Sequence, residues 1–138
     1  MRFLMMVKAN ADSEAGVLPG QEAIKEMTDF NEELVQAGVL LAGEGLHPSS
    51  TGFRTEITAG GKRVVDGPFA ETKELIAGFW LLQVRSGEEV LEWAKRCPEP
   101  VEVRQLVDAD HFAEVIAPED AERERRLGEE VRRQGGIA

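Results

Sequence analysis

A short stretch near the middle of the chain combines a carboxylate with a constrained turn. Asp66 is followed by Gly67, Pro68 and Phe69, and then by a charged run that ends at Glu74. Proline fixes its own φ angle and restricts the residue before it, whereas glycine tolerates backbone angles that are closed to other residues. We therefore expect Asp66 to hold one orientation, either as a general base or substrate anchor or as a turn residue that caps backbone N–H groups.

A second candidate site lies in the glycine- and proline-rich segment 43–50, which carries Glu44 and His47. Imidazole groups can shuttle protons near neutral pH, although a histidine before a proline is also an ordinary exposed loop residue. Glu44 stands between two glycines, which allow another group to approach the backbone closely. Asp66, His47 and Glu44 are accordingly the predicted catalytic residues.

Aromatic and basic residues complete the predicted pocket. Phe69, Phe79 and Trp80 are expected to line it, and apolar neighbours of this kind would raise the basicity of a nearby carboxylate by desolvation. Arg54 or Arg104 is expected to balance negative charge that develops on a substrate. The predicted chemistry is proton transfer without a cofactor, in which the carboxylate abstracts or holds the proton and the imidazole relays it.

Other reactive residue types give weaker patterns. Cys97 stands at helical core spacing before a proline, which indicates a small buried thiol rather than a nucleophile. Glu44, His47, Asp66 and His111 offer the ligand types of a metal site without a diagnostic spacing. No metal site is predicted, and His111 receives no catalytic role.

The composition restricts the classes of partner. The chain has 138 residues, and its 26 acidic residues against 16 basic ones give a net charge of -10. This balance opposes binding to nucleic acid or to anionic membranes. A single cysteine permits no internal disulfide, which favours a cytoplasmic location. The apolar run 3–7 is too short for a signal-peptide core or a membrane span.

Hydrophobic periodicity predicts the elements that must position these residues. The pattern predicts two helices, each followed by a strand, and a hairpin between the two halves. The predicted strands cover residues 3–7, 39–42, 76–84 and 101–106, the hairpin covers 53–65 with Gly60 and Gly61 at its turn, and the helices cover 21–37 and 86–97. Residues 10–20 are predicted to be a loop, and residues 71–74 either a charged lid or an exposed turn. This order favours a ferredoxin-like α+β sandwich, whose uncovered sheet face is expected to pair with a second copy.

The chain changes character near its end. Residues 1–117 are predicted to form the folded domain, and residues 118–138 a charged helical tail. Glu119 with Arg123 and Glu122 with Arg126 have the spacing of helix-surface ion pairs. The tail is expected to carry no chemistry, and it offers a surface for a protein partner.

Three blocks of the sequence, residues 40–46, 66–74 and 78–80, resemble the DGPF branch of the YCII-related proteins. Residues 92–98 and 101–104 extend the resemblance, which covers roughly residues 1–115. The resemblance implies a ferredoxin-like protomer within a dimeric α+β barrel. It also implies that the protein is one of a largely uncharacterised group, whose DGPF branch is often encoded near extracytoplasmic-function sigma factors.

The same resemblance implies only part of a catalytic site. Other YCII-related proteins are thought to use a His–Asp pair with the histidine on the first helix, and residues 21–37 contain no histidine. Asp66 and Glu44 lie inside blocks that match. The sequence therefore predicts a homodimer that binds an unknown small molecule, with cofactor-free acid–base chemistry if it is an enzyme. The alternative is a non-catalytic interaction or regulatory protein linked to a sigma factor.

Overall fold

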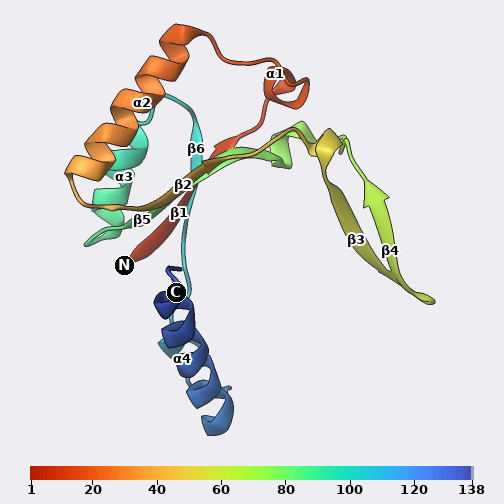
Figure 1. Cartoon of the computed structure of the whole chain (residues 1–138), viewed down its shortest axis with the longest axis vertical. Coiled ribbons are helices and arrows are strands. Elements are labelled where there is room, and N and C mark those ends of the chain that lie inside the picture. Colours follow the sequence, from red (N-terminus) through yellow and green to blue (C-terminus); the bar gives the residue numbers. More distant parts are fainter. Residues whose placement is uncertain (138) are drawn as a thin grey trace. The chain divides into compact units, whose positions relative to one another are not determined.

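Four strands form one antiparallel sheet in a computed structural model, which describes residues 1–137 (Figure 1). The strands lie in the order β2-β5-β1-β6. Two helices, α2 (Gln21–Gln36) and α3 (Gly87–Arg96), cover one face of this sheet. The strands are β1 (Arg2–Lys8), β2 (Leu40–Gly45), β5 (Ile76–Gln83) and β6 (Val101–Gln105).

The connection order β1-α2-β2-β5-α3-β6 with this strand order is a ferredoxin-like α+β sandwich, as the sequence predicts. The strand β2 runs further than predicted, to Gly45, because Glu44 and Gly45 pair with Phe79 and Gly78 of β5. Part of the glycine- and proline-rich segment 43–50 is therefore an edge strand. A hairpin is inserted between β2 and β5.

The inserted hairpin consists of β3 (Phe53–Thr58) and β4 (Gly61–Asp66), and it projects away from the sheet (Figure 1). Of the two glycines predicted at its turn, only Gly61 has a positive φ angle, +124°. Phe53, Val64 and Ile57 lie on one side of the ribbon and are 65%, 62% and 88% exposed. The hairpin thus keeps these three apolar side chains in solvent within one chain.

Capping explains where α2 ends and where α3 begins. Gly38 has a φ angle of +70° and donates its N–H to Val35 O, while Val39 donates to Leu34 O, which together form a Schellman motif at the end of α2. At the start of α3, Ser86 Oγ accepts the N–H of Glu89 at 3.1 Å. This hydrogen bond is one half of a capping box.

The other half of that box is different. Glu89 Oε2 accepts the backbone N–H of Arg85 at 2.7 Å, one residue before the N-cap. This hydrogen bond lowers the pKa of the Glu89 carboxyl below its usual range.

The core lies between the helices and one face of the sheet. Phe30 of α2 packs edge-to-face on Trp80 of β5, with ring centroids 5.5 Å apart, and on Trp93 of α3, at 6.3 Å. Side chains alternate along a strand, so the neighbours of the core residues turn to the other face. We call that face, which no helix of residues 1–105 covers, the outer sheet face; its apolar residues are Leu4, Met6, Ala42, Phe79 and Leu81.

Two short helices interrupt segments between the larger elements. The predicted loop 10–20 contains a one-turn helix, α1 (Ala11–Glu14), because Asn10 and Ser13 form a reciprocal capping box. Residues Thr72–Glu74 form a single exposed 3₁₀ turn, η2, as one of the two predicted alternatives stated.

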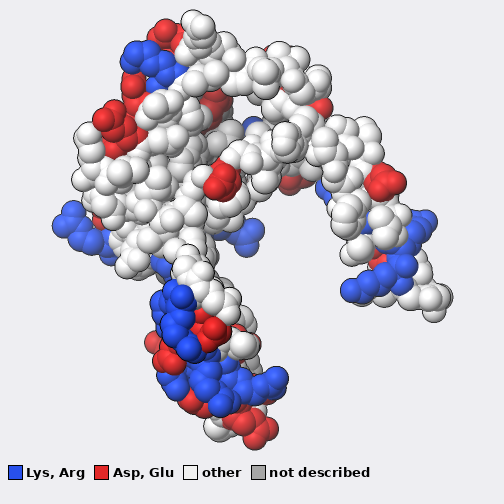
Figure 2. Space-filling view, in the orientation of Figure 1, with Lys and Arg blue, Asp and Glu red and all other residues white. Residues whose placement is uncertain are grey.

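From Leu106 onward, the described part of the chain forms a second compact unit. It contains a 3₁₀ turn, η3 (Ala109–Phe112), and the predicted charged helix, α4 (Pro118–Arg133), on which basic and acidic side chains crowd together (Figure 2). Among residues 1–137, no helix combines the length and the apolar composition needed to span a bilayer.

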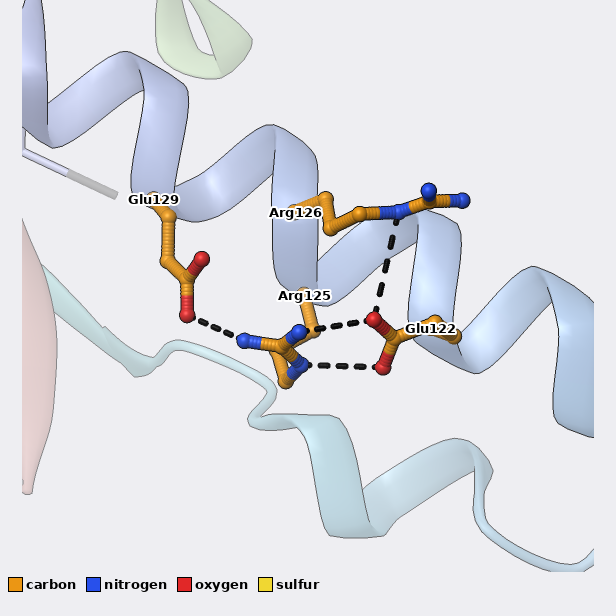
Figure 3. Close-up of polar contacts among 4 residues, drawn as sticks. All are labelled: Glu122, Arg125, Arg126 and Glu129. Atoms are coloured by element: carbon orange, nitrogen blue, oxygen red, sulfur yellow. Dashed lines mark hydrogen bonds and ion pairs between the residues drawn. The ribbon is translucent and has the colours of Figure 1, made fainter.

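Ion pairs follow the turns of α4. Arg125 binds Glu122 at 2.7 Å and also binds Glu129, whereas Arg126 lies 3.9 Å from Glu122 (Figure 3). The predicted pair of Glu122 with Arg126 is therefore present. Arg123 pairs with Asp120 at 3.0 Å, and not with the predicted Glu119.

Candidate functional site

A cleft of about 880 Å³ lies between the segment from α1 to α2 and the adjoining ends of β1, β2 and β5. The N-terminal half of α2 leaves the sheet uncovered there, since Ile24 is 51% exposed although it faces the cleft. Apolar side chains dominate the lining. The polar and charged lining residues are Lys8, Asn10, Asp12, Ser13, Thr28, Asn31, Glu44, His47 and Glu99.

Glycines form the floor of the cleft. Gly45 of β2 pairs directly with Gly78 of β5, and Gly43 pairs with Trp80. A Cβ on Gly78 would lie 2.9 Å from Glu44 O, and one on Gly43 would lie 3.0 Å from Trp80 Cδ1. A side chain at position 78 would therefore clash with the backbone of β2, and one at position 43 would press on the Trp80 ring, so the strands present bare backbone here.

Trp80 and Asn31 fix one another at the inner end of the cleft. The Trp80 indole N–H donates to Asn31 Oδ1 at 2.7 Å. Because the indole can only donate, the oxygen of the amide must face it, and the Asn31 NH₂ group faces elsewhere. No hydrogen bond from that NH₂ group occurs within the described part of the chain. Asn31 thus offers a donor that lines the cleft.

Sequence reasoning missed Asn31. The signal available was a polar residue on the buried side of an amphipathic helix, between Met27 and Leu34. Such a residue usually has a specific partner, but the partner here is 49 positions away in the chain.

A hydrogen-bonded bridge ties the wall of the cleft to the DGPF turn. The backbone N–H of Ser49 donates to Glu14 Oε1 at 3.1 Å, and the Ser49 hydroxyl donates to Glu14 Oε2. The same hydroxyl oxygen accepts the backbone N–H of Phe69 at 3.1 Å. This Glu14–Ser49–Phe69 bridge holds α1, the loop after His47 and the DGPF turn together.

The DGPF turn contacts that loop so closely that it requires glycine. Gly67 donates its N–H to Gly52 O at 2.9 Å, and a Cβ on Gly67 would lie 1.8 Å from Ser49 O. The Gly67–Pro68 peptide bond is cis. The motif therefore acts, in one chain, as a structural junction between the hairpin and the cleft wall.

The predicted catalytic residues separate into two groups. Glu44 and His47 line the cleft, whereas Asp66 is exposed at the end of β4 and lies outside it. Register pairs Glu44 with Phe79, so strand alternation turns both side chains toward the outer sheet face. We infer that Glu44 and Phe79 line the cleft with their backbone atoms, which the neighbouring glycines leave uncovered.

The predicted binding residues also lie apart. Trp80 lines the cleft and faces the helices. Arg54 stacks on the ring of Phe69, with the guanidinium 3.8 Å from the centroid, but neither residue lines the cleft. Arg104 pairs in register with Leu4 and therefore belongs to the outer sheet face.

The remaining reactive groups stay apart. Burial raises the pKa of the Cys97 thiol, which favours its neutral form. Within residues 1–137, no three histidine, cysteine, aspartate or glutamate residues come together as a metal-binding group. Glu44, His47, Asp66 and His111 are thus not gathered into such a site by one chain.

Comparisons with known proteins give one extensive match. A family model described as the YCII-related domain matches residues 1–115. The uncharacterized protein R00369 of Rhizobium meliloti (strain 1021) is 33% identical over 75 residues, which are 54% of this chain and 60% of that relative. The match therefore spans less than two thirds of the relative's length.

A solved structure shows a weaker likeness. It is the 5-chloro-2-hydroxyhydroquinone dehydrochlorinase TftG from Burkholderia phenoliruptrix AC1100, in a complex with 2,5-dihydroxybenzoquinone. Its TM-score is 0.43 at 14% identity, and the alignment covers 80% of this chain and 98% of that chain. A likeness of this size transfers no activity to the present protein.

Proposed function

The chain belongs to the YCII-related family, and from this premise we propose that it binds a small molecule in the cleft beside α2. The observation that carries the proposal is the cleft itself. Its volume of about 880 Å³ falls within the range of about 300–1,000 Å³ that is usual for ligand sites. Mostly apolar walls with a few polar groups are also usual for such sites.

For chemistry in this cleft we propose proton transfer by His47. It is the one imidazole among the lining residues, and imidazole groups can accept and donate protons near neutral pH. Asp66 lies outside the cleft of its own chain, so we give it no part in this proposal. Asp66 is an exposed residue at the end of β4, where the hairpin meets the DGPF turn.

We further propose that two copies pair through the outer sheet face. Leu4, Met6 and Phe79 lie side by side there and are only half-buried in one chain. Charged residues of both signs, among them Glu102 and Arg104, share the face and can pair across a two-fold axis.

The alternative function, a regulatory protein that acts through its tail, has less support. In α4, Arg123, Arg125, Arg126 and Arg133 are all paired with acidic residues of the same helix. The helix therefore keeps few charges available to guide a charged partner. For this reason we give the cleft precedence.

A variant that fills the cleft tests the proposal. Ala23 is exposed and lines the cleft, so Ala23→Trp should obstruct it without disturbing the core. A ligand at about 100 times its Kd adds about 2.7 kcal/mol of stability and so raises the melting temperature of the unmodified protein. The same compounds should not raise the melting temperature of Ala23→Trp, because they can no longer enter the cleft. Differential scanning fluorimetry against a metabolite library measures the shift.

The matched control is Ala121→Trp, which places the same side chain on the exposed surface of α4. This variant should keep the melting-temperature shifts of the unmodified protein. If Ala23→Trp responds to every compound as the control does, the cleft is not the binding site.

A further inference from the structure

We propose that the cleft selects a flat ring that carries an oxygen acceptor and no negative charge. This inference rests on the proposed small-molecule function and names the class of ligand. It starts from the floor, where Gly45 and Gly78 pair in register and neither carries a side chain. Glycine in a strand often marks a place where a ligand approaches the backbone closely.

There is open space beside Gly45, whereas position 78 has no room for a side chain. A Cβ on Gly45 would meet nothing within 4 Å, whereas one on Gly78 would lie 2.9 Å from Glu44 O. The space beside Gly45 is therefore free, and no side chain from Gly78, its partner in register, can occupy it. A planar ring can contact such a flat peptide surface over its whole face, which a puckered ring cannot.

The walls suit an apolar ring. Ala23, Ile24 and Met27 of α2 line one side of the cleft, and Val7 and Leu46 line it from the sheet ends. Burial of apolar ligand surface against these side chains contributes about 25 cal/mol per Å². The apolar walls and the glycine floor together favour a flat ring over an extended polar chain.

One polar group gives the ring an orientation. Asn31 has its oxygen occupied by the Trp80 indole N–H at 2.7 Å, which leaves its NH₂ group as a donor that lines the cleft. A carbonyl or phenol oxygen on the ring can accept this hydrogen bond. Asn31 is half-buried, so leaving its donor without an acceptor carries a cost.

The charged lining residues disfavour an anion. Even without Glu44, whose side chain faces the outer sheet face, two carboxylates, Asp12 and Glu99, stand against one lysine, Lys8. A carboxylated ring would meet net negative charge from these side chains. The lining therefore disfavours a ligand with negative charge.

Three probes of matched size separate these properties. Acetophenone has a flat ring and a carbonyl acceptor, cyclohexyl methyl ketone has the same acceptor on a puckered ring, and benzoate has a flat ring with a negative charge. Each is titrated into the full ¹⁵N-labelled chain while the Gly45 amide, the Asn31 side-chain amide and the Trp80 indole resonances are followed. We expect acetophenone to move all three resonances and to bind about tenfold more tightly than either analogue, a difference of about 1.4 kcal/mol.

Two variants test the floor and the donor separately. Gly45→Val fills open space without a clash, so the chain should fold and lose acetophenone binding, whereas Gly60→Val at the hairpin turn, also in open space, should bind normally. Asn31→Asp keeps an oxygen for Trp80 and removes the donor, and it should weaken binding about three- to tenfold. An unchanged Trp80 indole resonance shows that its hydrogen bond is kept.

Equal binding of the three probes, or full binding by Gly45→Val, would overturn the ring assignment. These results would leave the proposed function intact, provided that some ligand still moves the cleft resonances. If library compounds bind and none of them moves the Gly45, Asn31 or Trp80 resonances, the proposed function fails instead.

Discussion

At the scale of single residues, packing explains the DGPF turn better than chemistry does. Gly67 touches the backbone of Ser49, and the Ser49 hydroxyl joins Phe69 to Glu14. Asp66, the residue with the reactive side chain, is exposed. The motif thus sets the position of the loop that carries His47.

Substitution of Gly67 tests this structural role. In Gly67→Ala, the new Cβ would lie 1.8 Å from Ser49 O, so either the turn or the loop must move. We expect a loss of about 1–3 kcal/mol in the free energy of unfolding, as for other overpacked sites. Urea denaturation followed by tryptophan fluorescence measures it.

The control is Gly60→Ala, at a position where a Cβ meets nothing within 4 Å. Its free energy of unfolding should stay within about 0.5 kcal/mol of the unmodified protein. A Gly67→Ala variant as stable as this control would show that the junction is not rigid.

The site residues that the sequence did predict are those with marked local chemistry. Glu44 and His47 stand in a short glycine-rich segment, and both line the cleft. Asn31, Glu14 and Ser49 escaped prediction because their partners are 49, 35 and 35 positions away. Contacts of this range depend on the tertiary fold, which linear spacing does not encode.

At the scale of elements, the sequence predicted nearly every helix and strand of residues 1–105. Continuous or periodic apolar runs gave strong signals for β5 and α2, and Gly38 marked the end of α2. The one-turn helix α1 was missed because four residues are too short for a period, and only its Asn10–Ser13 capping box defines it. The end of β2 was missed because glycines weaken strand patterns.

The helicity of the charged helix α4 should depend on pH through the ionisation of Glu122. The hydrogen bond from Arg125 lowers the pKa of the Glu122 carboxyl below its usual range. A carboxyl with a lowered pKa stabilises the folded form above its unfolded pKa of about 4.3, and this contribution is lost as the pH falls through the folded value. Acidification should therefore reduce the helicity of residues 118–133, as measured by ¹³Cα chemical shifts in the full chain.

Two arginine variants identify the group responsible. Arg125→Gln removes the contacts to Glu122 and Glu129, so it should lower helicity at neutral pH and weaken the pH dependence. Arg126→Gln should have a smaller effect than Arg125→Gln, because Arg126 lies 3.9 Å from Glu122 and Arg125 lies 2.7 Å from it. An identical pH profile for Arg125→Gln and the unmodified chain would contradict the assignment.

At the scale of the whole molecule, the outer sheet face predicts self-association. Two copies of the 15.2 kDa chain should sediment as one dimer in analytical ultracentrifugation. Leu4→Glu places a charge in the middle of the half-buried apolar face and should shift the protein to monomers. Leu91→Glu, on an exposed position of α3, should leave the dimer intact.

Sedimentation of the unmodified protein as a monomer at micromolar concentration would refute the proposed pairing. The sequence could suggest the pairing only through its apolar strands. Which of their side chains face outward depends on register, and a shift by one residue exchanges the two faces. Residues such as Phe79 and Trp80, adjacent in the chain, therefore serve different surfaces.

The segment that carries the hairpin leaves the sheet after β2 and returns to it at the start of β5. Leu46 donates its N–H to Ala77 O at 2.8 Å, so residues 46–75 begin and end beside one another. A brief turn could join β2 directly to β5 and leave a minimal four-stranded scaffold. A transplanted loop could begin and end at the same two strands, so the sheet could serve as a scaffold for displaying foreign peptides.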